Sequence, residues 1–225
     1  MGKQDLVNRS MSCLSKVLGH ATQLEIEKGV GSYLIGYNGQ QYLDFGAGIA
    51  VNATGHCHPT VVKAIKDQSD KLLHGCAGVI YYDQNITLAE ELGTINDGDL
   101  NSVFFTQSGT EAVEAALKCA TYVRNQQQII AFRGSFHGRT LGSLSVTTSN
   151  VKYLDRYPLA YKDRVILEYP YYYQNEAPLN TEEGYLNYLE TSLHSLDDTK
   201  VAAVIIEPVL GEGGYVPAPT PVLAK

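Results

Sequence analysis

The sequence has little of what marks several common classes of protein. Its four cysteines are widely spaced without a C-x-x-C pair, so neither a zinc knuckle nor a disulfide framework is indicated. The formal net charge of -7 disfavours a nucleic-acid partner, which would need clustered lysine and arginine. No apolar run approaches the roughly 20 residues of a membrane span, and Met1–Arg9 lack the apolar core of a signal peptide. We therefore expect reduced thiols, a cytoplasmic location, and neither a membrane nor a nucleic-acid partner.

Short apolar runs separated by helical lengths begin after Ser102. This alternation is typical of a largely parallel α/β sheet. The expected strands are 103–105, 128–132, 164–167 and 201–206, and the expected helices are 109–124 and 182–196. Four tyrosines after the third strand, at positions 169, 171, 172 and 173, are expected to pack on the surface, because no basic residues alternate with them as in a base-stacking platform.

The first hundred residues have a different pattern. A short helix is expected within 6–24, followed by a hairpin of strands 32–35 and 41–44 around the turn-forming pair Asn38-Gly39. Pro59 then opens an apolar-periodic segment that predicts a helix through Leu73. The histidines in His56-Cys57-His58 lack a third metal ligand, so helix entry is favoured over a metal site.

Ser108, Gly109 and Thr110 stand between a predicted strand and a predicted helix. Glycine lets an anion approach the backbone, and the free amides at a helix start attract phosphate. An N-terminal capping box formed by Ser108 and Glu111 is an equally good interpretation of the same residues. The lysine of a nucleotide-binding P-loop is missing, so a nucleoside triphosphate is disfavoured.

Two later segments add candidate ligand-binding side chains. Phe136-His137-Gly138-Arg139 places an aromatic ring, an imidazole and a guanidinium together; the ring could cover a flat heterocycle and Arg139 could hold a carboxylate. Considered separately, Phe136 is as readily explained by core packing and Arg139 by a surface salt bridge. Glu207 ends a predicted strand, where parallel sheets bind ligands, and Glu212 follows in a glycine-rich loop. Two surface acids in a solvated turn are the alternative interpretation.

Together these segments resemble the class III, or ω-amino-acid, aminotransferases of fold type I. The segments 42–51 and 55–59 are similar to the start of that family, so the resemblance covers nearly the whole chain. It implies pyridoxal 5'-phosphate as cofactor and an incomplete fold type I large domain at 61–225, preceded by a small-domain segment at 1–60. A homodimer that acts on a small-molecule amino acid and a 2-oxo acid is expected for the full-length family.

The resemblance also implies roles for single residues. Ser108, Gly109 and Thr110 would bind the cofactor phosphate, Phe136 would stack on the pyridine ring, and His137 and Glu207 would lie near it. Ile49 would touch substrate and Arg139 would bind its carboxylate. Glu212 would pair with a distal arginine when an ω-amino substrate is bound and would release it for glutamate.

The favoured activity is transfer of an amino group from 4-aminobutyrate to 2-oxoglutarate. Val113 stands where the acetylornithine branch usually has asparagine, and Leu210 where the family usually has glutamine. The alternatives are an acetylornithine or ornithine aminotransferase, an aminomutase, or a non-catalytic remnant that binds a full-length partner.

The family's Schiff-base lysine and the aspartate that pairs with the pyridinium nitrogen both lie downstream of the Glu207 segment, so the chain is expected to be an inactive fragment. In the family's sheet order the second strand lies between the third and fourth, and the first lies beyond strands that the chain lacks. The first strand is therefore expected to be separated from the others, and the isolated chain to be poorly stable.

Overall fold

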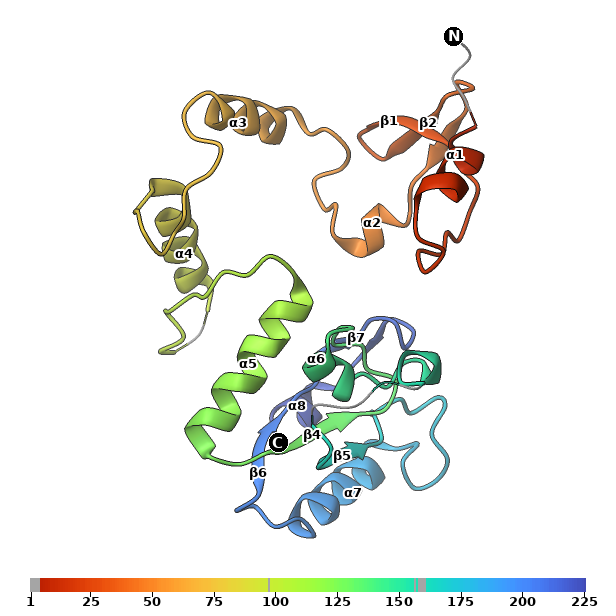
Figure 1. Ribbon diagram of the computed structural model, residues 1–225. Coiled ribbons are helices and arrows are strands. Elements are labelled where there is room, and N and C mark those ends of the chain that lie inside the picture. Colours follow the sequence, from red (N-terminus) through yellow and green to blue (C-terminus); the bar gives the residue numbers. More distant parts are fainter. Residues whose placement is uncertain (1–4, 97, 156, 158–160) are drawn as a thin grey trace. The chain divides into compact units, whose positions relative to one another are not determined.

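The computed structural model describes residues 5–96, 98–155, 157 and 161–225, and Figure 1 traces the chain. It forms two compact units, residues 1–101 and 102–225. Residues 1–4 of the expected small-domain segment lie outside the described residues. The boundary expected after residue 60, between the small-domain segment and the large domain, refers to the domains of the full-length family and stays a prediction.

The first unit contains a small antiparallel sheet with helices before and after it. Its elements are α1 Leu6–Cys13, β1 Ile26–Val30, β2 Tyr33–Gly36, β3 Gln41–Leu43, α2 Ala47–Ala50, α3 Pro59–Ser69 and α4 Asp83–Ile95. The sheet order β1-β2-β3 confirms the predicted hairpin, and Gly39 adopts the positive φ of 79° that its turn requires. Neither β1 nor α4 was predicted. Gly29 was interpreted as a break between elements, so β1 was missed. The strand needs glycine at this position because a Cβ would meet the His56 ring 2.5 Å away.

The second unit is built on a parallel sheet. Its elements are α5 Gly109–Arg124, β4 Gln128–Phe132, α6 Leu141–Ser145, the 3-10 helix η1 Val151–Tyr153, β5 Arg164–Leu167, α7 Glu182–His194, β6 Val201–Val204, β7 Val209–Leu210, β8 Val216–Pro217 and α8 Thr220–Leu223. The parallel order β5-β4-β6 confirms that the second predicted strand lies between the third and the fourth.

Alternate residues of β4 bury themselves against two different helices. Ile129 and Ala131 share one core cluster with Leu117 of α5, whereas Ile130 and Phe132 share the other with Tyr185 and Leu189 of α7. Since successive strand residues point to opposite faces, α5 and α7 cover the two faces of the sheet. The result is a three-layer α/β/α unit (Figure 1).

The tyrosine prediction is wrong for Tyr169. Its ring is only 3% exposed and belongs to the core, and its hydroxyl lies 2.9 Å from the carbonyl oxygen of Glu207 and 3.0 Å from that of Val216. A tyrosine can be buried where its hydroxyl finds such acceptors. Tyr173 does lie on the surface, with 98% exposure.

The strand predicted at 103–105 is also wrong. These residues form no strand, and Phe104 is 79% exposed. A strand exists only when a neighbour satisfies its backbone groups, and no strand among the described residues pairs with this segment. The exposure agrees with the expectation that this run is separated from the rest of the sheet.

Candidate active site

A pocket of about 580 Å³ lies at the N-terminus of α5. It brings together two segments that are about 30 residues apart in sequence. The lining residues are Ser108, Gly109, Thr110, Val113, Phe136, His137, Gly138, Arg139 and Thr140. Six residues singled out from the sequence therefore share one cavity.

The start of α5 combines both interpretations of its sequence. Ser108 is the N-cap, and its side chain accepts a hydrogen bond from the Glu111 amide at 3.4 Å. The amides of Gly109 and Thr110 are free of acceptors within the helix, as in the first turn of any helix, and carry its positive dipole end. A Cβ at Gly109 would meet no heavy atom within 4 Å, so the pocket is open at the point where an anion would approach.

The hydroxyl of Thr110 is engaged by protein groups. It lies 2.8 Å from the Thr140 hydroxyl and 2.6 Å from that of Ser143. Gly138, with φ 136°, allows this close approach, because a Cβ there would collide with the hydroxyls of Thr110 and Ser143. The backbone amides at the start of α5 are thus better placed than the Thr110 hydroxyl to receive a phosphate.

Glu114 of α5 links the start of that helix to the segment after Phe136. It was not predicted from the sequence. Its Oε1 atom accepts hydrogen bonds from the amides of Gly142 at 2.8 Å and Ser143 at 3.1 Å. Those amides open α6, so a carboxylate of α5 caps the next helix. The available signal was its position four residues after Thr110, on the same helix face.

Glu207 joins two loops at the carboxyl ends of the parallel strands. One carboxylate oxygen accepts from the Phe136 amide at 2.7 Å, and the other accepts from the Gly211 amide at 2.8 Å. Both bonds are charge-assisted and therefore strong. Glu207 thus holds the backbone of the residue proposed to cover a cofactor ring.

His137 carries an unsatisfied polar atom. Its ring is 9% exposed, and Nε2 has no hydrogen-bond partner within the described part of the chain. Burial lowers the pKa of the imidazole, and the negative charge of Glu207 opposes that shift. Buried polar atoms in native proteins normally have partners, so the unpaired nitrogen marks His137 as a candidate site residue.

Glu212 stands in the loop between β7 and β8. It accepts hydrogen bonds from the Ser149 hydroxyl at 2.5 Å and the Tyr153 hydroxyl at 2.7 Å. Tyr153 in turn packs against Phe136, with ring centroids 5.8 Å apart and an interplanar angle of 65°. Arg139 is exposed on the pocket lining. Sequence reasoning missed Ser149 and Tyr153, since neither belongs to a recognisable pattern.

Ile49 belongs to the first unit and is 85% exposed. It lies in α2 with φ 65°, a strained value for a β-branched residue. Asp44 fixes this turn, because its carboxylate accepts from the amides of Gly46 at 2.9 Å and Ala47 at 3.0 Å and contacts His56 Nε2 at 2.7 Å. His56 thus has a carboxylate partner.

Among the described residues, no three His, Cys, Asp or Glu side chains are grouped to bind a metal, and no helix is long and apolar enough to cross a membrane.

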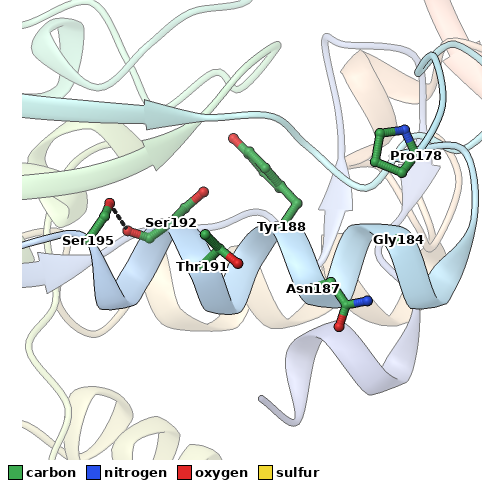
Figure 2. A pocket seen from close by; sticks show the side chains of 7 residues that line it. All are labelled: Pro178, Gly184, Asn187, Tyr188, Thr191, Ser192 and Ser195. Atoms are coloured by element: carbon green, nitrogen blue, oxygen red, sulfur yellow. Dashed lines mark hydrogen bonds between the residues drawn. The ribbon is translucent and has the colours of Figure 1, made fainter.

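Another pocket, of about 410 Å³, lies along α7 (Figure 2). It is lined by Pro178, Gly184, Asn187, Tyr188, Thr191, Ser192 and Ser195. No charged side chain is among them. Figure 2 shows that the Ser195 hydroxyl donates a hydrogen bond to the backbone carbonyl of Ser192. This surface lacks groups for acid-base chemistry or for binding a charged ligand.

Residues 15–225 match the family model described as aminotransferase class-III. The acetylornithine aminotransferase of Methanosarcina mazei is 38% identical over 198 residues, covering 87% of this chain and 45% of that protein. The 5-aminovalerate aminotransferase of Pseudomonas aeruginosa is 32% identical over 217 residues, covering 94% and 49%. The chain therefore spans about half the length of the curated relatives that it matches.

Solved structures share the fold. An ω-aminotransferase from Paracoccus denitrificans superposes with a TM-score of 0.86 at 24% identity, covering 98% of this chain and 53% of that one. A mutant aminotransferase from Vibrio fluvialis, described as bound to pyridoxal phosphate, gives a TM-score of 0.83 at 25% identity, covering 100% and 54%. This agreement confirms the predicted α/β class and a partial fold type I domain.

Proposed function

The chain belongs to the class-III aminotransferase family, and from that premise we propose that it supplies the cofactor-binding half of an ω-amino-acid aminotransferase. Pyridoxal 5'-phosphate is the cofactor of this family. The observation that carries the proposal is the α5 pocket, where the helix start at Gly109 and Thr110, the ring of Phe136 and the residue His137 line one cavity. These groups match a phosphate, a flat ring and a polar ring substituent.

Five of the lining residues, together with Glu207 outside the lining, have distinct roles in this proposal. When bound, the cofactor supplies an electron sink for the carbon that carries the amino group. The amides of Gly109 and Thr110 hold its phosphate, with Ser108 capping the helix, and Phe136 covers one face of its ring. Glu207 fixes the backbone of Phe136, and the neutral imidazole of His137 offers a hydrogen bond.

The proposed substrates carry a carboxylate and a terminal amine. Arg139 binds the carboxylate by a two-pronged contact, Ile49 contacts the substrate chain, and Glu212 exchanges partners between the two half-reactions. The leading donor is 4-aminobutyrate, supported by the apolar Val113 in the pocket lining. Acetylornithine is the second candidate, favoured by relatives of that name at 38% identity. We also propose that the full-length protein acts as a homodimer in the cytoplasm.

The 225 residues alone are proposed to bind cofactor without completing transamination. That reaction needs a lysine that bonds to the cofactor and moves protons. Among the described residues, no lysine lines the pocket, and Lys118 lies within α5, about two turns past Thr110. A non-catalytic role as the partner of a longer homologue is the alternative.

A donor panel tests the proposal. The protein at its full encoded length is incubated with 2-oxoglutarate and, in turn, 4-aminobutyrate, 5-aminovalerate, acetylornithine and ornithine, and glutamate formation is measured. We expect 4-aminobutyrate to give the highest kcat/KM. A preference for acetylornithine would establish the second candidate, and no transfer from any donor would leave only the non-catalytic alternative.

A further inference from the structure

A cluster beside the α5 pocket joins three residues from separate segments. Ser149 precedes η1, Tyr153 ends it, and Glu212 lies in the loop after β7. Ser149 donates to one oxygen of the Glu212 carboxylate and Tyr153 donates to the other. Within the described part of the chain, both oxygens are therefore held by hydroxyl groups.

Tyr153 also reaches the cofactor side of the site. Its ring meets Phe136 edge to face, the geometry that aromatic pairs favour. One side chain thus touches both the residue proposed to cover the cofactor ring and the acid proposed to respond to substrate.

The electrostatics keep the Tyr153 hydroxyl a hydrogen-bond donor to Glu212. The hydrogen bond to Glu212 raises the pKa of Tyr153, and the positive charge of Arg139 opposes that shift. The phenol therefore stays protonated at neutral pH and remains a donor. Glu212 itself is exposed, so its carboxylate can leave the two hydroxyls without a large desolvation cost.

We propose that Ser149 and Tyr153 are positioning residues that hold Glu212 in a resting position and so set the preference between dicarboxylic and ω-amino substrates. While the hydroxyls hold Glu212, its cationic partner is free to bind the second carboxylate of 2-oxoglutarate. When an ω-amino donor binds, Glu212 leaves the hydroxyls and neutralises that partner. This inference rests on the proposed function, in which Glu212 changes partner between half-reactions.

The resting contact is tested by titration of the protein at its full encoded length. Ultraviolet difference titration of wild type against Tyr153→Phe isolates the Tyr153 phenol, and Tyr173→Phe serves as the matched exposed control. We expect Tyr153 to titrate above the exposed tyrosine, and Glu212→Gln to bring its pKa down toward the usual 10.0. An unchanged Tyr153 titration in Glu212→Gln would overturn the resting contact.

The functional half of the inference is tested by kinetics. Tyr153→Phe keeps the ring against Phe136 and removes only the hydroxyl, while Ser149→Ala removes the other donor. Loss of both frees Glu212 for its cationic partner, so KM for 2-oxoglutarate should rise about tenfold or more, the effect expected of a hydrogen bond to a charged group. KM for the ω-amino donor and kcat should change less than twofold.

Equal changes in both KM values, or none, would overturn the selective role. The two tests also separate this inference from the proposed function. The titration reports the contact even if the protein transfers no amino group, in which case the positioning of Glu212 stands while the proposed function fails. Normal transamination with an unshifted Tyr153 would remove only the inference made here.

Discussion

The two compact units of this chain differ in what holds them together. In residues 102–225 β4 is buried on both faces by side chains of α5 and α7. In residues 5–96 and 98–101 Gly36 is the one buried residue, and Phe45, Leu73 and Tyr81 are 84% or more exposed. Regular strands and helices thus form in both, but only one has a core.

The difference separates local structure from stability. Turn and capping residues suffice to specify the hairpin and α3 of the first unit, whereas burial of apolar surface supplies the free energy of folding. By itself, the described part of the first unit therefore buries too little apolar surface to be stable. The second unit carries its own core and, with it, the α5 pocket.

The largest effect should come from the core of the second unit. Tyr185 is 0% exposed, contacts Tyr188 and donates to the Glu168 carbonyl. Tyr185→Ala should lower the free energy of unfolding of residues 102–225 by about 3–5 kcal/mol, measured by denaturant titration. The matched control, Tyr81→Ala, removes a tyrosine that is 93% exposed in the first unit and should cost less than about 0.5 kcal/mol. Equal costs would contradict the contrast between the units.

A smaller effect should follow at Glu207. Glu207→Gln places an amide donor opposite a backbone donor, so Phe136 or Gly211 loses its acceptor, at a cost of about 1–3 kcal/mol. Pyridoxal phosphate affinity should fall as Phe136 loosens. Denaturant titration and equilibrium binding measure the two effects. Glu176→Gln, at an exposed acid, is the control and should change neither.

Loss of the α5 cap should be milder. Ser108→Ala removes the acceptor of the Glu111 amide, which should cost about 0.5–1 kcal/mol. Ser108→Thr keeps the acceptor and should recover most of that loss in the same denaturant titration. If alanine and threonine behave alike, the hydroxyl does not stabilise the helix start.

The smallest effect is local and depends on pH. Hydrogen bonds from His56 and from the Ala47 and Gly46 amides lower the pKa of Asp44 below 3.8. A depressed carboxyl pKa means that the stabilisation is complete above pH 3.8 and is lost as the pH falls through the lower folded value. Amide exchange at Gly46 and Ala47 should therefore quicken in acid, and in Asp44→Asn it should be faster at neutral pH. If amide exchange at Gly46 and Ala47 is unchanged both in acid and in Asp44→Asn, Asp44 is not the group that fixes this turn.

The difference between local structure and long-range packing also explains which features could be predicted from the sequence. The bounds of α5 were predicted residue for residue, because Ser108 and Glu111 mark its start locally. The strand at 103–105 was wrong because pairing is not local: the apolar run is present, but no strand among the described residues pairs with it. Tyr169 was misplaced for a related reason, since the acceptors of its hydroxyl lie 38 and 47 residues away.

The site shows the same limit. Motif residues such as Gly109, Phe136 and Glu207 were found from the sequence because their types suggest chemistry. Glu114, Ser149 and Tyr153 were not, since each acts through partners in distant segments. Hydroxyls and single acids are common on protein surfaces, and only their contacts distinguish these three.

The central claim is that the start of α5 binds the cofactor phosphate. The most direct test records amide chemical shifts of the 225-residue chain while pyridoxal phosphate, inorganic phosphate or pyridoxal is added. The account predicts saturable shifts at Gly109 and Thr110 with both phosphate-bearing molecules, a shift at Phe136 only when the pyridine ring is present, and little change at Gly109 with pyridoxal. Shifts at Gly109 and Thr110 that are absent, or that are the same for pyridoxal and pyridoxal phosphate, would contradict it.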